Sequence, residues 1–462
     1  MNDQVDLDEP VDDKAEKVRR YATWMSSIFL RNEQRFYHVD APNTPLSRRD
    51  LEQAFINIVT KREPHAGLSA EILRSVCDVA IERKHSDRAR SIPVWGKTMA
   101  CYPGNKSRIT WLDTGVVELN TWREPAYRSV EPDPKEDALE PFKQYFSWVF
   151  PRPQERMMVL SWLSWCLRNE DKKPAWALLL YSRQKGTGKS TFCEIARKLF
   201  GEENTATQNN VDKLASRFNA TPLINKLIIS EEFSLRPDSS QSNAIKTYIT
   251  DPVVLSERKG KEAERLPLRS IFVFTTNHLP TWLEEGERRY YMVETDHDGH
   301  AAGPKSKEFN NVIRSVKEAL SNPATLNAFY QHLMGAKLLE TFDPYSLNTE
   351  VHGTEIMKRV AGASRQTHEH ELEEHLAALG QPVQTNAAVK KYVMTEFKVS
   401  GNSTRHLMMA IGWTQHLVKW GGVDYARAIW AAKDYHVVDG RVIGPNGYNK
   451  PVEEVLLKDV QL

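Results

Sequence analysis

A short apolar run, a loop with two glycines and a helical pattern follow one another in the middle of the chain. The run spans residues 176–181, the loop SRQKGTGKST spans 182–191, and the helical pattern continues over 192–200. Strand, glycine loop and helix in this order are the context in which a phosphate-binding P-loop occurs. The candidate nucleotide-binding residues are Gln184, Lys185, Gly186, Thr187, Gly188, Lys189, Ser190 and Thr191.

Several residue types in this loop have a chemical use. Gly186 and Gly188 let successive backbone N–H groups and the helix N-terminus approach a phosphate closely. Lys189 is expected to reach the β- and γ-phosphates, and the Ser190 hydroxyl is expected to bind Mg²⁺. The strict P-loop pattern has glycine where this chain has Arg183, and an ordinary glycine turn is the alternative interpretation.

Two carboxylates follow the apolar strand pattern at 227–230, downstream of the loop. Glu231 is expected to bind Mg²⁺ directly or through water, and Glu232 is expected to act as general base toward the attacking water. The alternative is a buried strand whose exposed end is acidic by coincidence. The position after a P-loop favours the catalytic interpretation.

A third strand pattern, at 269–276, ends in an amide. Asn277 could bridge a γ-phosphate and the attacking water, and thereby report whether hydrolysis has occurred. The alternative is a turn-forming asparagine shortly before Pro280.

Two adjacent arginines, Arg288 and Arg289, follow the third strand pattern. Ring-forming ATPases complete each site with an arginine from the neighbouring subunit, and either residue could be that arginine finger. Three glutamates lie beside the pair, so ion-paired surface arginines are the alternative.

A charged segment between the second and third strand patterns predicts a β-hairpin. SERKGKEAER (256–265) has Gly260 at a suitable turn position and is flanked by the apolar runs 253–255 and 266–268. Cationic side chains near the tip would contact a nucleic-acid backbone without sequence specificity, and a solvated loop is the alternative. The candidate nucleic-acid-binding residues are Arg258, Lys259 and Lys261.

Short apolar runs alternate with helical patterns over about residues 172–300, which predicts an α/β core with a parallel sheet and helices on both faces. We expect a disordered acidic tail over 1–13, a mixed α+β domain over 14–135, the P-loop domain over 136–341, and a winged-helix-like domain over 350–462. The first helix is expected over 14–32, and a hairpin turn is expected at Asp439-Gly440.

The composition is that of a soluble globular protein, because 62 Lys and Arg balance 61 Asp and Glu and 40% of the 462 residues are apolar. The longest apolar runs are far shorter than the roughly 20 residues that a membrane helix needs. The acidic start lacks the features of a signal peptide, so we expect a cytoplasmic protein without membrane contact. The four scattered cysteines predict reduced, buried thiols.

The segment THEHELEEH (367–375) contains residue types that ligate metals. The zinc-binding pattern H-E-x-x-H needs two histidines four residues apart, but His370 and His375 are five apart. A solvated helix face is therefore the expected structure.

Taken in chain order, these motifs resemble those of superfamily 3 helicases of the AAA+ class. The resemblance is to the ATPase half of the phage and plasmid primase–helicase family, which is related to the poxvirus primase–helicase. It covers about residues 105–300 and extends more loosely to the C-terminus. The segments that carry it are SRQKGTGKST (182–191), LIISEE (227–232), IKTYITD (245–251), SERKGKEAER (256–265), FVFTTN (272–277) and GERRYY (286–291).

The resemblance implies an ATP-dependent replicative DNA helicase that forms a hexameric ring of identical subunits and moves 3′ to 5′ on single-stranded DNA at a fork or origin. ATP and Mg²⁺ would be the cofactors, the two glutamates the Walker B pair, Asn277 the sensor, and Arg288 or Arg289 the trans finger. The hairpin would grip the strand, and the C-terminal winged helix would contact duplex DNA. The first 135 residues are too few for a primase domain, so a separate primase or polymerase is expected.

Two other functions are compatible with the residues. A P-loop kinase or metabolic NTPase would use the loop and the glutamates, but would have no use for both a trans arginine and a charged hairpin. An ATP-assembled, DNA-binding replication initiator would need nucleotide binding at Lys189 without hydrolysis by Glu232.

Overall fold

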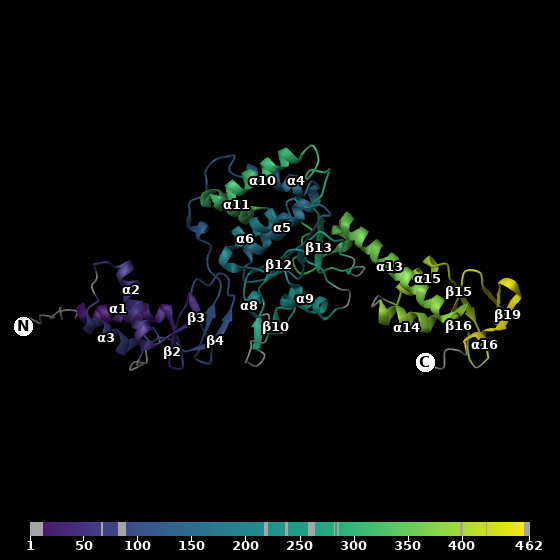
Figure 1. Cartoon of the computed structure of the whole chain (residues 1–462), viewed down its shortest axis with the longest axis horizontal. Helices are drawn as coiled ribbons and strands as arrows, with labels where there is room; N and C mark the ends of the chain where they lie inside the picture. The colour runs from purple at the N-terminus through teal and green to yellow at the C-terminus, as the bar shows by residue number, and fades with distance from the viewer. Residues whose placement is uncertain are drawn as a thin grey trace, which may run out of the picture.

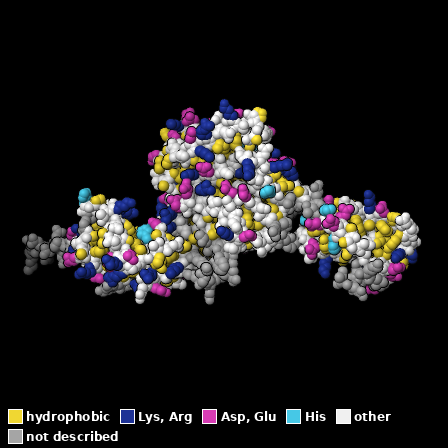
Figure 2. All heavy atoms as spheres, viewed as in Figure 1, with side chains coloured by type: hydrophobic (Ala, Val, Ile, Leu, Met, Phe, Trp, Pro, Cys, Tyr) yellow, Lys and Arg dark blue, Asp and Glu magenta, His cyan; other side chains and the backbone are white. Residues whose placement is uncertain are grey.

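The computed structural model describes residues 13–65, 68–81, 89–216, 220–235, 239–256, 264–280, 282–283, 286–397, 401–421 and 423–456. Figure 1 shows an N-terminal, a central and a C-terminal part in chain order. No described helix is long and apolar enough to cross a membrane. On the face shown in Figure 2, basic and acidic side chains are interspersed, as the nearly balanced composition predicts.

The N-terminal part is a mixed α+β unit with two three-stranded sheets, ordered β1-β2-β3 and β4-β6-β5. The expected helix over 14–32 is too long, because residues 29–32 pair with the next strand and bury Phe29 and Leu30. Of the expected acidic tail, only Asp13 lies within the described residues, where it begins the first helix. The elements are α1 (Asp13–Ile28), β1 (Phe29–Asn32), β2 (Arg35–His38), β3 (Ala41–Leu46), α2 (Arg48–Arg62), α3 (Ala70–Ala80), β4 (Trp95–Ala100), β5 (Ile109–Trp111) and β6 (Val117–Asn120).

The central part is built on a five-stranded parallel sheet in the order β13-β7-β12-β9-β8. Strands β7, β9 and β12 are buried over their whole length, which explains their uninterrupted apolar sequences. The sequence prediction of an α/β core with a parallel sheet is confirmed. The elements are α4 (Glu140–Val149), α5 (Pro153–Arg168), β7 (Ala177–Tyr181), α6 (Lys189–Phe200), β8 (Thr205–Thr207), α7 (Val211–Leu214), α8 (Ala220–Leu223), β9 (Leu227–Ser230), α9 (Ser240–Thr250), β10 (Val253–Ser256), β11 (Glu264–Pro267), β12 (Ile271–Thr276), β13 (Tyr290–Glu294), α10 (Ser306–Ser321), α11 (Pro323–Gly335) and α12 (Thr349–His352).

The segment between the first two parts packs against the central core. The Tyr127 hydroxyl donates to the Leu199 carbonyl oxygen at 2.7 Å, and the Asp133 amide donates to the Ala324 carbonyl oxygen at 3.0 Å. Residues 127–133, between the first two parts, are therefore held by helices α6 and α11.

Strands β10 and β11 form the expected hairpin, with antiparallel pairing from Val253–Pro267 to Ser256–Glu264. Figure 1 shows it projecting from the central part on the side away from helices α4, α10 and α11. The tip, which contains the candidate residues Arg258, Lys259 and Lys261, lies outside the described residues.

Helix α13 joins the central part to the C-terminal part. Its first turns place Ile356 and Val360 in the central core, and its later turns place Leu372 and Leu376 in the core of the C-terminal part. The elements are α13 (Glu355–Leu379), β14 (Val383–Thr385), α14 (Asn386–Glu396), α15 (Ser403–Ala410), β15 (Thr414–Val418), β16 (Arg427–Ala431), β17 (His436–Val438), β18 (Arg441–Gly444), β19 (Tyr448–Pro451) and α16 (Val452–Leu456).

The C-terminal strands form two small sheets, β14-β16-β15 and β17-β18-β19. The expected turn joins β17 to β18, with positive φ angles of 49° at Asp439 and 72° at Gly440. This hairpin lies in the second sheet, whereas the hairpin beside helix α14 is β15–β16. The winged-helix assignment therefore stays a prediction, and residues 436–444 are not the hairpin that shares a sheet with β14.

The histidine-rich segment lies on α13, as expected for a helix face. The His375 ring stacks on Tyr392 of α14, with centroids 3.7 Å apart and an interplanar angle of 8°. Among the described residues, no group of three or more His, Cys, Asp or Glu side chains could hold a metal ion. Part of this helix face thus contacts its neighbour instead of water.

Candidate nucleotide-binding site

The glycine loop lies at the carboxyl edge of the sheet, between the end of β7 and the start of α6. Gly188 is the N-cap of α6, with a φ angle of +99°, and a Cβ atom there would lie 2.7 Å from Cγ2 of Val149. The Tyr145 hydroxyl donates to the Gly188 carbonyl oxygen at 3.0 Å. Helix α4 therefore packs closely against the loop. Only glycine both adopts this left-handed backbone conformation and fits the space at position 188.

Two contacts between buried hydroxyl groups hold the loop against the ends of strands β7 and β13. Thr187 Oγ1 lies 2.9 Å from Ser182 Oγ and 2.9 Å from Thr295 Oγ1, and all three side chains are buried. Thr295 follows strand β13, so the loop is fixed to both its own strand and the neighbouring one. A buried polar network of this kind favours one conformation of the loop.

Lys189 is the buried cation of the site. Its Nζ donates to Oδ1 of Asn277 at 2.8 Å and to Oγ of Ser182, and the residue is 8% exposed. Burial lowers the pKa of the Lys189 ammonium to about 8, and Asp296 opposes this shift. Because this ammonium has few contacts with water, a bound anion would stabilise its charged form.

The sheet order explains why Asn277 meets Lys189. Strand β12 lies directly beside β7 and runs parallel to it, so residues that follow the two strands emerge at the same edge. Strand β9 lies on the other side of β12, and Glu231 and Glu232 follow it. Three chemically different groups thus converge, although they are far apart in the sequence.

The two glutamates occupy a sharp turn after β9. The Glu231 amide donates to Oδ1 of Asn209 at 3.0 Å, and Glu232 has a φ angle of +57°. The next amide, of Phe233, donates to the Thr275 carbonyl oxygen at 2.8 Å. A left-handed backbone is uncommon for glutamate, and strain of this kind occurs preferentially at functional sites.

These groups line one cavity of about 510 Å³, which falls within the roughly 300–1,000 Å³ of small-molecule sites. Ten predicted residues line it, namely Lys185, Gly186, Thr187, Gly188, Lys189, Ser190, Thr191, Glu231, Glu232 and Asn277. Gln184 does not line it, and its carbonyl oxygen instead accepts a hydrogen bond from Ser182 Oγ at 2.6 Å.

Four lining residues were not predicted from the sequence: Asn209, Thr275, Asn310 and Ile313. Asn209 follows the three-residue strand β8, which has no distinct sequence pattern. Asn310 and Ile313 lie one turn apart on α10, and their contribution depends on how that helix packs. No local signal in the sequence marks Asn310 or Ile313 as residues that line a cavity.

The oxygen donors in the cavity suit Mg²⁺. Ser190 and Glu231, which carry a hydroxyl and a carboxylate, line the same cavity, and Mg²⁺ typically binds one or two such groups together with water and substrate phosphates. These donors are too few to hold the ion by themselves, so the fit is to a metal that arrives with a nucleotide.

The two arginines lie at the opposite edge of the sheet. The Arg289 carbonyl oxygen accepts a hydrogen bond from the amide of Ala177, the first residue of β7, at 2.8 Å. The loop follows the last residue of the same strand, so about 16 Å of strand separates the two edges at roughly 3.3 Å per residue. Neither Arg288 nor Arg289 can therefore reach the cavity of its own chain.

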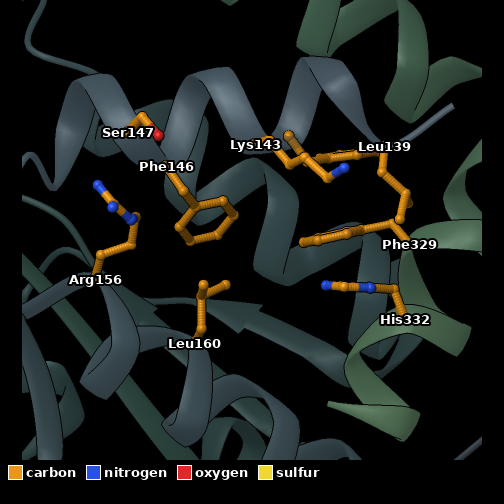
Figure 3. Close-up of a pocket in the computed structure, with 9 residues that line it drawn as sticks. Leu139, Lys143, Phe146, Ser147, Arg156, Leu160, Phe329 and His332 are labelled. Atoms are coloured by element: carbon orange, nitrogen blue, oxygen red, sulfur yellow. The ribbon is translucent and has the colours of Figure 1, made fainter. Parts of the chain in front are cut away.

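A second cavity, of about 160 Å³, lies among α4, α5 and α11. Figure 3 shows Phe146 and Leu160 pointing toward one another across it, with Lys143, Arg156 and His332 around them. It contains none of the loop residues and is smaller than the roughly 300 Å³ at which ligand pockets begin. It is therefore not part of the nucleotide site.

The parallel sheet and the loop at its carboxyl edge define the central part as a P-loop-like α/β core. Residues 180–289 match a family of unknown function, DUF5906, and this range runs from the end of β7 to the arginine pair. No curated protein sequence matches the chain.

Two solved structures of one protein region share the fold of nearly the whole chain. The A form apo structure of the NrS-1 C-terminal region has a TM-score of 0.51 and 15% identity, covering 90% of this chain and 98% of that one. Another apo structure of the same region has a TM-score of 0.52 and 16% identity, covering 89% and 100%. An inhibitor-bound JCV helicase has a TM-score of 0.28 and 15% identity, covering 50% of this chain and 60% of that one.

Proposed function

We propose that this chain is an ATP-dependent replicative DNA helicase of a phage or other mobile element, which assembles as a homo-oligomeric ring and moves along single-stranded DNA. The observation that carries the proposal is the convergence of Lys189, Asn277, Glu231 and Glu232 at one cavity. The motif resemblance supplies the helicase class, and the ring is proposed as hexameric, with 3′ to 5′ movement.

We assign a hydrolytic role to each side chain, and the position of that side chain supports the assignment. Backbone N–H groups of the glycine loop and the N-terminus of α6 bind the phosphates, and Lys189 exchanges its contacts with Asn277 and Ser182 for the β- and γ-phosphates. Glu232 accepts the proton of the attacking water. Asn277, released from the lysine, orients that water.

Ser190 and Glu231 would hold Mg²⁺, which neutralises charge on the phosphates when it is bound. Glu231 keeps its place through its amide contact with Asn209. In this proposal, different residues of the cavity serve the phosphates, the metal and the attacking water.

Two features favour a nucleic-acid motor over a metabolic enzyme. The arginine pair lies at the edge of the sheet that is remote from its own site, so a nucleotide site that either arginine completes must belong to a neighbouring subunit. The β10–β11 hairpin projects from the same part of the fold, and we propose that Arg258, Lys259 and Lys261 contact the DNA backbone.

Changing Lys259 and Lys261 to Ala should reduce the salt slope of single-strand binding by up to about two units.

The C-terminal part is proposed to contact duplex DNA at the fork or origin, with its helices α14 and α15 and the β15–β16 hairpin. A separate primase or polymerase would act on the unwound strand. Deletion of the C-terminal part should lower fork-DNA affinity while leaving single-strand affinity largely unchanged.

The decisive experiment is steady-state ATP hydrolysis with and without single-stranded DNA, for the wild type and Glu232→Gln. DNA-stimulated hydrolysis that disappears in the variant supports the helicase and leads to a strand-displacement assay. Hydrolysis that ignores DNA would point to a metabolic NTPase. Nucleotide binding without hydrolysis, abolished by Lys189→Ala, would point to an initiator that ATP only assembles.

A further inference from the structure

The turn that carries the two arginines is built around a buried carboxylate. The Glu287 side chain is 3% exposed, and its Oε1 accepts hydrogen bonds from the Arg289 amide at 2.9 Å and from Arg289 Nη1 at 3.1 Å. A buried carboxylate requires compensating donors or cations. Glu287 therefore fixes both the backbone and the side chain of Arg289.

The two adjacent arginines consequently have different freedom. Arg289 is half-buried and paired with Glu287. Arg288 is exposed, and within the described part of the chain it makes no hydrogen bond or ion pair. The arginine that is able to reach outward is thus Arg288, while Arg289 holds the turn in place.

The same carboxylate also faces helix α9. Nζ of Lys246 lies 3.6 Å from Oε2 of Glu287, and the lysine side chain is 15% exposed. Three residues after the end of α9, the chain enters strand β10 of the hairpin. Nζ of Lys173 donates to the Tyr248 carbonyl oxygen in the last turn of α9 at 2.6 Å, which holds the helix end against the core.

We propose that Glu287 is a positioning residue that presents Arg288 as the trans-acting arginine and, through Lys246, ties that arginine to the helix leading into the DNA hairpin. The inference rests on the proposed function. A single buried carboxylate shared by cations from two elements is a short physical connection between the subunit interface and the hairpin. Movement of either element changes the partners that remain for Glu287.

The first test is subunit mixing. Arg288→Ala and Glu287→Gln should each lower DNA-stimulated ATP turnover by about tenfold or more with little change in KM for ATP. Mixing either variant with Glu232→Gln protein should restore turnover, because the intact site of one chain receives a well-placed arginine from the other. Arg289→Ala should cost less than Arg288→Ala.

The controls separate the inference from the proposed function. Glu340→Gln removes a carboxylate of an ion pair whose two side chains are each 84% exposed, and it should behave as wild type. If Arg288→Ala is rescued by mixing and Glu287→Gln is not, the positioning role is wrong. If neither arginine variant is rescued at any ratio, the shared site itself is wrong. Should Glu287→Gln fail to fold, Glu287→Asp keeps the charge but retracts it, and the same rescue is expected.

The second test addresses the tie to the hairpin. Lys246→Met keeps the stem of the side chain and removes its charge, so it should lower the ratio of DNA-stimulated to basal ATP turnover by about threefold or more. Lys337→Met is the matched control on the exposed pair. An unchanged stimulation ratio in Lys246→Met would overturn the tie while leaving the role of Glu287 at the arginine turn intact.

Discussion

Nζ of Lys189 lies 2.8 Å from Oδ1 of Asn277, although 88 residues separate them in the sequence. The lysine that should bind phosphates is therefore held by the amide that should sense them. Under the proposed function, nucleotide binding would replace this contact, and the position of Asn277 would then depend on the occupancy of the site.

Substitution of Asn277 should separate binding from turnover. Asn277→Ala should retain ATP affinity within about threefold and lower kcat by about a hundredfold, because Lys189 is freed but the water loses its orienting group. Asn277→Asp should instead weaken ATP binding by about tenfold, since a carboxylate holds the ammonium more strongly than an amide does. Equilibrium binding and steady-state turnover of both variants check this, and equal loss of binding in both would contradict it.

ATP affinity should fall as the pH rises above 8. Burial lowers the pKa of free Lys189 to about 8, and bound phosphates favour the charged form, so the bound state has the higher pKa. Below pH 8 the free lysine is already charged and affinity should be flat; above it, affinity should fall by up to about tenfold per pH unit. Lys189→Arg stays charged, and a pH dependence that survives in this variant would belong to another group.

The two loop glycines should respond differently to alanine. Gly188→Ala introduces a Cβ atom 2.7 Å from Val149 at a φ angle of +99°, and it should lower stability by about 1–3 kcal/mol and abolish ATP binding. Gly186 has a φ angle of +80° with nothing within 4 Å of the added atom, so Gly186→Ala should cost only about 1 kcal/mol. Thermal unfolding and nucleotide titration measure both effects. Equal destabilisation would mean that the contact with α4 is unimportant.

The four cysteines should be unreactive in the folded protein. All are buried, and burial raises the thiol pKa to about 12 in Cys77, Cys166 and Cys193 and to about 11 in Cys101. Since the thiolate is the nucleophile, maleimide should label them only after unfolding. Mass spectrometry of native and urea-treated samples tests this, and fast labelling of any native cysteine would show that its segment opens.

The sequence predicted the site residues that follow strands better than the helix residues that line the same cavity. Glu231, Glu232 and Asn277 could be placed because each follows a short apolar run, and a parallel sheet brings the ends of such runs to one edge. Asn310 and Ile313 could not be placed, because a helix position lines a cavity only through the packing of the whole helix. The first helix was overextended, because β-pairing of residues 29–32 outweighs a continuous helical pattern.

Local chemistry and tertiary packing thus decided different properties of this protein. The sequence by itself determined the glycine loop, the acidic strand end and the hairpin, since glycine placement, charge and apolar periodicity act over a few residues. Only the tertiary structure decided that Arg289 is held by Glu287 while Arg288 is exposed, and that both lie at the edge remote from Lys189. Strand order, burial and distances across the fold depend on contacts between residues far apart in the chain, and no local pattern encodes them.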